Sequence, residues 1–376
     1  FNLLDALWVS GKYKSNVVEF KAPGATGSFS IQAGAIQMYG YGINNDAIET
    51  GIALLTGETR AFTPPRVLAI GDPVRIYAAS SVQGINLSNY KENIAQLNVS
   101  GAYDEVGGTK LRRLILGDKN TENLALTDIS GLNQLINLEE LDIRGFKGIT
   151  SLDLSTLPGL KIVKLDNSGI TSFQPTQGVK LDVLSLPSTL QVLSLDKTTI
   201  NTTFTYTPTI SLRTLSLKTT TGIDEKSLVL TWYDAIKDNE IAIQNASLTA
   251  WGINWENITP AQLIALKSIG TISLRGYVKL SSMTFQEMND LVELFGPNVF
   301  NLTGELIIDA PPGIVLSGPA ESLAATDATF TGVLFPVGAS SILYSIENGV
   351  LQIIDNQRYW VLGVIKINEA TGVLSS

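Results

Sequence analysis

The chain has 376 residues and a formal net charge of −9 at pH 7, with 44% hydrophobic and 16% charged residues. A chain of this length is expected to divide into two or three domains. Because it contains no cysteine and no histidine, disulfides, thiolate zinc sites, cysteine nucleophiles and serine–histidine–aspartate catalysis are excluded. It has no basic stripe and no apolar run of about 20 residues, so we expect neither nucleic-acid binding nor a membrane span.

The first part of the chain, residues 1–70, contains short stretches in which apolar and polar residues alternate. Such stretches occur at Val17–Phe20 and Ser28–Ile31, and the turn residues Pro23 and Gly24 separate them. This alternation predicts β-strands. We expect an N-terminal β-domain or an irregular cap here, because the repeats that follow would otherwise expose core leucines at their open end.

A Leu-x-x-Leu-x-Leu phrase recurs along the middle of the chain. Its steps are roughly 11 residues, and two steps make a unit of roughly 22, within the range for leucine-rich repeats. Clear copies begin at Leu138, Ile149, Leu160, Ile170, Leu181, Leu190 and Leu212, and weaker copies at Val82, Ile94 and Leu111. Such a repeat cannot bury its apolar face alone, so its copies must stack. We therefore predict a leucine-rich-repeat solenoid over residues 71–312. Its buried leucines should include Leu141, Leu152, Leu184, Leu193 and Leu215.

Each phrase also places one polar residue between its last two apolar residues, where it should point outward from the sheet. These outward residues are Asn86, Asn98, Asp142, Asp153, Lys164, Ser185, Ser194 and Ser216. They predict one polar stripe without aromatic residues. It is either a ligand-binding surface or, more simply, a set of solvated residues that keeps the sheet soluble.

Two of these outward residues are acidic. Asp142 and Asp153 are expected on neighbouring strands, where the pair could share a proton or bind a cation. Lys164 on the next strand offers simple charge compensation instead.

From about residue 224 the pattern changes to longer repeats that contain helices. Helices are predicted over residues 224–236, 259–267 and 284–295, from acidic first turns, a threonine–proline start and a capping box. Residues 242–244 and 247–251 are interpreted as strands. A group of aromatic residues in this part could form a sugar platform but fits core packing better. It comprises Trp232, Tyr233, Trp251 and Trp255.

After residue 313 the sequence is all-β, with short apolar stretches such as Ile342–Ile346 and Val350–Ile354 between turn residues. This spacing is typical of an immunoglobulin-like sandwich. We predict such a domain over residues 313–376. Because a complete one usually needs about 100 residues, we expect it to be incomplete and to continue beyond Ser376.

Two parts of the chain resemble known families. The repeats, such as Leu138–Ile143 and Ile149–Ser155, resemble the leucine-rich repeats of bacterial surface proteins and of gut-phage proteins. The last part is similar to bacterial immunoglobulin-like domains of the invasin and intimin type. The residues that carry this similarity are Leu316–Pro319, Phe335–Pro336, Tyr344–Ile346 and Ala370–Leu374.

The segment between the two parts, Leu294–Phe300, resembles a junction in large structural proteins of crAss-like phages that infect Bacteroides. The chain departs from the usual repeat pattern at Phe146 and Ser168, which occupy positions where such repeats carry asparagine.

These patterns together predict a mainly β fold with some α: a leucine-rich-repeat solenoid, an immunoglobulin-like sandwich and an N-terminal β cap or domain. We expect a non-enzymatic structural or binding protein, with no catalytic residues, no cofactor and no metal site.

The resemblance implies a tail-associated component of a phage virion, used for assembly or host-surface attachment. The implied partners are other virion or surface proteins in an oligomeric assembly, and a glycan or protein on a host surface. The alternative is a bacterial cell-surface or secreted adhesin. A third hypothesis is a carbohydrate-active enzyme with an accessory solenoid, but the sequence offers it no carboxylate pair in a supporting context.

Overall fold

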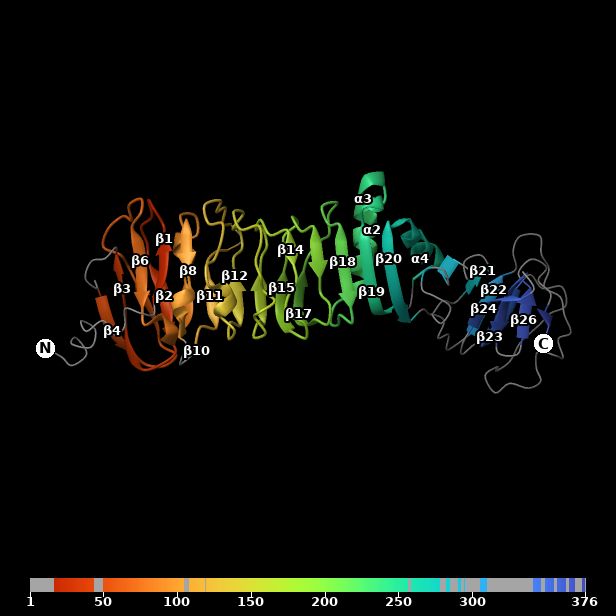
Figure 1. The fold of residues 1–376 in the computed structure, drawn as a ribbon, viewed down its shortest axis with the longest axis horizontal. Coiled ribbons are helices and arrows are strands. Elements are labelled where there is room, and N and C mark those ends of the chain that lie inside the picture. The colour runs from red at the N-terminus through yellow and green to blue at the C-terminus, as the bar shows by residue number, and fades with distance from the viewer. Residues whose placement is uncertain are drawn as a thin grey trace. The chain divides into compact units, whose positions relative to one another are not determined.

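The computed structural model describes residues 17–43, 50–104, 108–118, 120–255 and 258–277 and short stretches beyond them. Those stretches are 282–284, 290–291, 294, 305–309, 341–345, 349–354, 357–362, 365–368 and 374–375. The chain divides into two compact units, Phe1–Leu212 with Thr220–Ile223 and Arg213–Thr219 with Asp224–Ser376. Both contain many strands, while the described helices are few, so the fold is mainly β with some α (Figure 1).

The largest sheet of the first unit, called the long sheet below, has eight strands in the order β17-β15-β13-β12-β11-β7-β2-β5. In chain order these are β2 (Phe29–Ala33), β5 (Thr59–Phe62), β7 (Val82–Asn86), β11 (Arg113–Ile115), β12 (Glu140–Asp142), β13 (Ile162–Lys164), β15 (Lys180–Ser185) and β17 (Thr199–Thr205). All neighbours from β7 to β17 are parallel. By contrast, β2 is antiparallel to both β7 and β5. The pairing direction of the long sheet therefore changes at β7.

A second, antiparallel sheet of the first unit has five strands in the order β4-β3-β6-β1-β8. They are β1 (Val18–Lys21), β3 (Gln37–Ile43), β4 (Thr50–Leu54), β6 (Pro73–Tyr77) and β8 (Gln96–Asn98). The expected strands at 17–20 and 28–31 are confirmed as β1 and β2. Both sheets join strands from residues 1–70 to strands that follow in the sequence.

Aromatic side chains fill the space between β1, β2 and β3. The ring of Phe29 lies 5.6 Å from that of Phe20, 5.5 Å from that of Tyr41 and 5.7 Å from that of Phe62. Beside them Tyr90 is fully buried and donates its hydroxyl hydrogen to the Gly27 carbonyl at 2.8 Å. Burial, with a smaller effect of Tyr41, raises the pKa of Tyr90 to about 12. This aromatic core closes the N-terminal end of the apolar column.

The core of the long sheet is a column of apolar side chains in register. Its members are Ile31, Ile85, Leu114, Leu141, Val163 and Leu184, each paired with the next across neighbouring strands. Each is at most 1% exposed. Since parallel strands lie about 4.8 Å apart, such a column packs one apolar side chain directly on the next.

The phrases between these strands lie outside the long sheet. Some form the parallel pair β14 (Ser172–Phe173) and β16 (Val192–Ser194). Four of the five leucines expected in the core, Leu141, Leu184, Leu193 and Leu215, are confirmed as fully buried. Leu152 is only half-buried, because residues 151–154 form no strand. Successive 11-residue steps thus belong to different sheets.

The first unit also contains shorter elements. They are η1 (Ala79–Ser81), η2 (Ser88–Tyr90), η3 (Ser100–Ala102) and η4 (Leu132–Gln134), with the strand pair β9 (Tyr103–Asp104) and β10 (Gly108–Thr109). Isolated parallel bridges join Asn98 to Ser130, Asn123 to Phe146 and Thr199 to Thr221. At the expected asparagine positions, Phe146 is fully buried and Ser168 is 2% exposed.

The second unit contains three parallel strands joined by helices. These are β18 (Thr214–Lys218), β19 (Ser247–Asn254) and β20 (Thr271–Tyr277). Two predicted helices are confirmed as α2 (Glu225–Ile236) and α4 (Pro260–Ala265), which continues into η5 (Leu266–Ser268). Asp224 caps α2, and Thr259 with Gln262 forms a capping box on α4.

The strand predicted at 242–244 is wrong, because these residues belong to the short helix α3 (Glu240–Gln244). The Asn239 side chain caps this helix by accepting a hydrogen bond from the Ala242 N–H at 2.8 Å. The strand predicted at 247–251 is confirmed as part of β19.

Further strands follow in the second unit. They are β21 (Ser282–Thr284), β22 (Glu305–Asp309), β23 (Ser341–Ser345), β24 (Gly349–Ile354), β25 (Gln357–Leu362), β26 (Ile365–Asn368) and β27 (Leu374–Ser375). The last four pair antiparallel in sequence order. The immunoglobulin-like sandwich stays a prediction, since residues 313–340 lie outside the described residues. Most of the helix expected at 284–295 lies outside them as well. No helix in the described part of the chain is long and apolar enough to cross a membrane.

The turns that follow several strands need a left-handed backbone. Gly145 (φ +80°), Asn167 (φ +56°), Lys197 (φ +56°) and Thr219 (φ +55°) each lie three residues after an outward residue. At Gly145 a Cβ atom would lie 2.1 Å from the Thr121 carbonyl oxygen. Glycine is needed there for close approach as well as for its φ angle.

We expect Leu184→Ala to lower the free energy of unfolding by about 2–5 kcal/mol, because it opens a cavity in the column. Urea unfolding of the full chain, followed by far-ultraviolet circular dichroism, measures this. The control is Leu124→Ala, since Leu124 is 73% exposed and its loss should change stability by less than about 0.5 kcal/mol. Equal effects of the two substitutions would contradict a buried column.

Gly145→Ala and Gly178→Ala separate backbone strain from close approach. Both glycines have φ near +80°, but a Cβ at Gly178 (φ +83°) would have nothing within 4 Å. Gly178→Ala should therefore cost only about 1–2 kcal/mol of left-handed strain. Gly145→Ala should cost about 1–3 kcal/mol more through overpacking. The same urea titration measures both free energies of unfolding. An equal unfolding midpoint for the two variants would show that the close approach of Gly145 to the Thr121 carbonyl does not affect stability.

Candidate functional site

The eight predicted outward residues do not form one stripe. Four of them lie on the long sheet: Asn86 on β7, Asp142 on β12, Lys164 on β13 and Ser185 on β15. The other four lie elsewhere: Asn98 on β8, Ser194 on β16, Ser216 on β18 and Asp153 outside any strand. The prediction of a single stripe is therefore wrong. Successive 11-residue steps belong to different sheets, while in-register neighbours on the long sheet are 21 to 29 residues apart.

Asp142 does not face solvent as predicted, since it is only 2% exposed. Arg144, two residues later, folds back over it and donates from Nε to Oδ1 at 2.9 Å and from Nη2 to Oδ2 at 2.6 Å. This hydrogen-bonded pairing with Asp142 raises the pKa of Arg144 despite its partial burial. The predicted pairing of Asp142 with Asp153 is also wrong. The strand neighbours of Asp142 are Ile115 and Lys164.

A ladder of ion pairs crosses the outer face of β11, β12 and β13. One row runs from Arg112 to Glu139 and on to Lys161, whose Nζ lies 3.2 Å from a Glu139 carboxylate oxygen. Burial acts to raise the pKa of Glu139, but hydrogen bonds from Lys161 and Arg112 outweigh it and lower the pKa.

A second row of the ladder runs from Arg113 to Glu140 at 2.7 Å and on to Lys164 at 3.4 Å. Lys164 also lies 3.8 Å from Asp142, which supports its interpretation as charge compensation. The carboxylates of this row are buried, with Glu140 8% and Asp142 2% exposed, and each has a cationic partner. The charged side chains of both rows therefore pair with one another across the strands.

The serines among the outward residues are partly covered. Ser185 is 7% exposed, and its hydroxyl donates to the Asp166 carboxylate. Ser194 and Ser216 are half-buried. Asp166 was not singled out from the sequence, and it extends the polar contacts beyond the ladder toward β15.

Three other outward residues close the turns that follow them. The side-chain oxygens of Asn86, Asn98 and Asp153 accept hydrogen bonds from the backbone N–H two residues later, at 2.9, 3.0 and 3.0 Å. In each case the residue that donates this N–H is a serine. The hydroxyls of Ser100 and Ser155 also donate to the side-chain oxygens of Asn98 and Asp153, each at 2.6 Å. These are Asx turns, in which the side chain serves its own backbone.

Asn123 is among the buried polar residues that the sequence analysis did not single out. Asn123 is fully buried, and its Nδ2 donates to the carbonyls of Lys91 at 2.7 Å and Ile94 at 2.9 Å. Its Oδ1 accepts from the N–H groups of Ala125 and Leu126, each at 2.9 Å. Such a fully bonded buried amide fixes two successive coils to each other.

The tryptophans of the second unit divide between core and surface. Trp232 and Trp255 are fully buried, in agreement with core packing. Trp251 is half-buried on β19, with the Lys218 Nζ 5.0 Å and the Arg275 Cζ 4.3 Å from its ring centre. Its Nε1 donates to the Ser273 hydroxyl at 3.0 Å. With cations at this ring, Trp251 is poorly placed to stack on a sugar.

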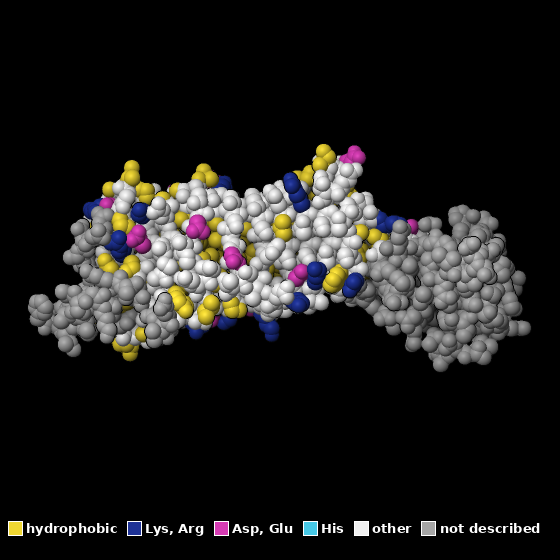
Figure 2. Space-filling model, viewed as in Figure 1, with side chains coloured by type: hydrophobic (Ala, Val, Ile, Leu, Met, Phe, Trp, Pro, Cys, Tyr) yellow, Lys and Arg dark blue, Asp and Glu magenta, His cyan; other side chains and the backbone are white. Residues whose placement is uncertain are grey.

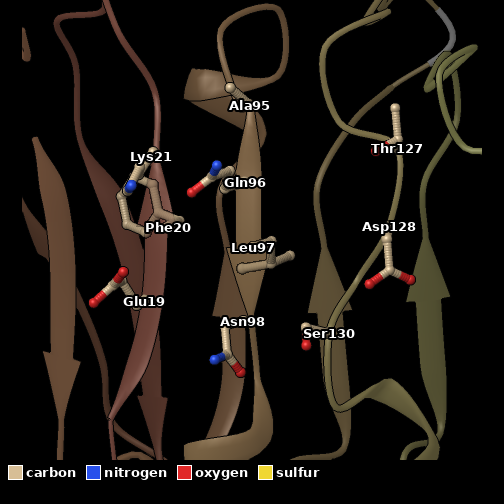
Figure 3. A pocket seen from close by; sticks show the side chains of 10 residues that line it. All are labelled: Glu19, Phe20, Lys21, Ala95, Gln96, Leu97, Asn98, Thr127, Asp128 and Ser130. Carbon is tan, nitrogen blue, oxygen red and sulfur yellow. The ribbon is translucent and has the colours of Figure 1, made fainter. Parts of the chain in front are cut away.

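A groove of about 310 Å³ lies in the first unit beside β8. It is lined by Glu19, Phe20, Lys21, Ala95, Gln96, Leu97, Asn98, Thr127, Asp128 and Ser130. On the face shown in Figure 2, acidic and basic side chains are interspersed near β1 and β8 without forming a patch of one sign. Figure 3 shows how Lys21 and Glu19 on one side and Asp128 on the other flank Gln96 and Asn98. Asn98 is the one predicted outward residue in this groove.

The groove forms where strand pairing changes direction. On one side β8 pairs antiparallel with β1, and on the other a single parallel bridge joins Asn98 to Ser130. A smaller hollow of about 120 Å³ lies at β7, which is antiparallel to β2 and parallel to β11. Of these two hollows, the groove reaches the volume of small-molecule sites, about 300–1,000 Å³, and the hollow at β7 does not.

The described residues include no group of three or more carboxylates, cysteines or histidines arranged to hold a metal ion. Comparison with protein-family models gives no match, and comparison with curated proteins gives none either.

The Asx turn at Asp153 leads to a pH-dependent prediction. The Ser155 hydroxyl, followed by the Ser155 N–H, lowers the pKa of Asp153. A carboxyl whose pKa is lowered by folding stabilises the fold above its unfolded pKa, and this contribution is lost as the pH falls through the folded value. Ser155→Ala should therefore raise the pKa of Asp153 toward its ordinary value and reduce that acid-dependent loss.

Carbon-detected nuclear magnetic resonance titration of the aspartate carboxyls between pH 6 and pH 2 measures the shift. Ser88→Ala is the matched control, because it changes a serine at the same position of the Asn86 turn. An Asp153 pKa unchanged by Ser155→Ala would mean that the hydroxyl does not stabilise the carboxylate.

Proposed function

We propose that this chain is a non-enzymatic structural and binding protein. Its central part would be a leucine-rich-repeat solenoid with an N-terminal β cap, and its last part an immunoglobulin-like module. The observation that carries the proposal is the in-register apolar column through β7, β11, β12, β13 and β15. A column of this kind makes a stiff support whose stability comes from stacking neighbours rather than from a single globular core.

The outer face of the long sheet supports the same role. Its charges form ion pairs across strands, and its asparagine and aspartate side chains close turns. Groups engaged in this way stabilise the stack and offer little to a reacting substrate. Catalysis would also need an activated nucleophile or a tuned acid–base pair, and the absence of histidine removes its commonest base.

The resemblance to phage and bacterial surface proteins gives the setting of the proposal. The proposed protein is a tail-associated virion component that works in an oligomeric assembly with other virion proteins and contacts a host surface. The alternative is a bacterial surface or secreted adhesin that binds a host protein or glycan. Both use the modules for reach and attachment.

The location of the polypeptide tests the proposal. Tryptic peptides of this chain should be found in purified phage particles from cultures of gut Bacteroides, at a constant ratio to the capsid protein. Crosslinking in intact particles should join the chain to other virion proteins. Peptides found instead in the surface-labelled envelope fraction of the bacterium would favour the adhesin, and peptides confined to the cytosolic fraction would contradict both.

A further inference from the structure

The groove beside β8 differs from the outer face of the long sheet in its free polar groups. Within the described residues, the side chains of Lys21, Gln96, Thr127 and Asp128 have no hydrogen bond or ion pair. On the long sheet, by contrast, the charges of the ladder are paired across strands. In concave ligand sites a small number of polar groups fix the orientation of the ligand, and this groove offers such groups without partners in the described part of the chain.

The charges around the groove nearly cancel. Lys21 brings one positive charge and Asp128 one negative charge, while Glu19 is paired with the Arg75 Nε at 2.9 Å. A strongly anionic ligand would find one cation beside two carboxylates, in a chain with a net charge of −9. The charge balance therefore favours an uncharged ligand.

The remaining groups are suited to hydroxyls. The Gln96 amide can donate and accept, the Asp128 carboxylate accepts, and the Lys21 ammonium donates. The Asn98 Oδ1 is engaged by Ser100, which leaves the Asn98 Nδ2 as a donor toward the groove. A sugar presents several hydroxyls that each donate and accept, and it matches this mixture better than a ligand with only donors or only acceptors.

The floor of the groove lacks an aromatic surface for stacking. Phe20 is fully buried and Leu97 is 3% exposed, so both support the groove from below. A single sugar would therefore be held mainly by hydrogen bonds and would bind weakly. Useful affinity would arise when several copies of the chain contact a repeating polymer, through effective concentration.

We propose that this groove binds an uncharged sugar unit of a surface glycan, through Lys21, Gln96, Asn98 and Asp128. The inference rests on the proposed binding role of the protein and names the class of ligand that is bound. The proposed binding site then lies in the first unit, on residues other than those of the ion-pair ladder.

Affinity electrophoresis of the full chain in native gels tests the inference. The gels contain dextran, yeast mannan or arabinogalactan as neutral probes, and polygalacturonate as an acidic probe. At least one neutral polysaccharide should retard the chain, and polygalacturonate should retard it less. No retardation by any neutral probe, or stronger retardation by polygalacturonate, would overturn the inference.

Substitutions locate the binding. The double variant Gln96→Ala with Asp128→Ala removes an amide and a carboxylate from the groove, and it should weaken retardation about tenfold or more. The control variant Glu92→Ala with Gln134→Ala removes the same groups from exposed positions outside the groove and should bind like the unmodified chain. Both should melt at the temperature of the unmodified chain, because none of these side chains has a partner among the described residues. Equal binding by the two double variants would place the site elsewhere.

The result can be separated from the test of the proposed function. A chain found in phage particles that binds no neutral polysaccharide would leave the structural role standing and end the sugar inference. A chain that binds a neutral polysaccharide through the groove but is confined to the cytosolic fraction would support the sugar inference and contradict the proposed structural role.

Discussion

The in-register apolar column is the constraint on which the rest of the first unit depends. Leu114, Leu141, Val163 and Leu184 must face the same side of four consecutive parallel strands. Side chains alternate across a strand, so the residues on either side of each column member must point outward. A shift of one residue in any strand would turn the apolar side chain toward solvent and the polar ones inward. The register therefore decides both what is buried and what the outer face can display.

The same constraint explains why so many outward polar residues have structural partners. Consecutive strands leave the sheet at the same position, so each turn must redirect the chain within a few residues. Asx turns at Asn86 and Asn98 follow β7 and β8 in this way. Left-handed residues such as Gly145 and Asn167 lie in the turns after β12 and β13. Threonine hydroxyls add bonds between coils, as from Thr189 to the Ile170 carbonyl at 2.8 Å. The polar face is thus largely a product of the stacking.

Sequence alone could predict the features that depend on local signals. The burial of Leu141, Leu184 and Leu193, the cap of α2 and the capping box of α4 all follow from residues within a few positions of one another. The helix α3 was missed because it is short, and its alternating apolar residues are equally typical of a strand. The assignment of alternate phrases to different sheets was missed for a different reason. The same apolar phrase occurs in strands of both sheets, so the phrase itself does not indicate to which sheet a strand belongs.

Other features depend on residues that meet only after folding. Asp142 is buried because Arg144 folds back onto it, and a short spacing of acid and base could have indicated this. The groove could not be predicted from any local pattern, because β1, β8 and residues 127–130 are far apart in the sequence. Its residues also lie partly in the cap, outside the recurring phrase.

The position of the groove follows from how antiparallel strands join parallel ones in the first unit. Parallel and antiparallel pairs differ in their hydrogen-bond geometry. The two patterns must meet on one strand of each sheet, and these strands are β7 and β8. Both hollows lie beside them. At β7 the strand pairing continues in register on both sides, so the hollow is small. At β8 only the Asn98–Ser130 bridge joins the next segment, so the strands diverge and polar side chains remain without partners. The groove therefore lies where antiparallel and parallel pairing meet, while the ion pairs of β11, β12 and β13 lie where the parallel pairing is continuous.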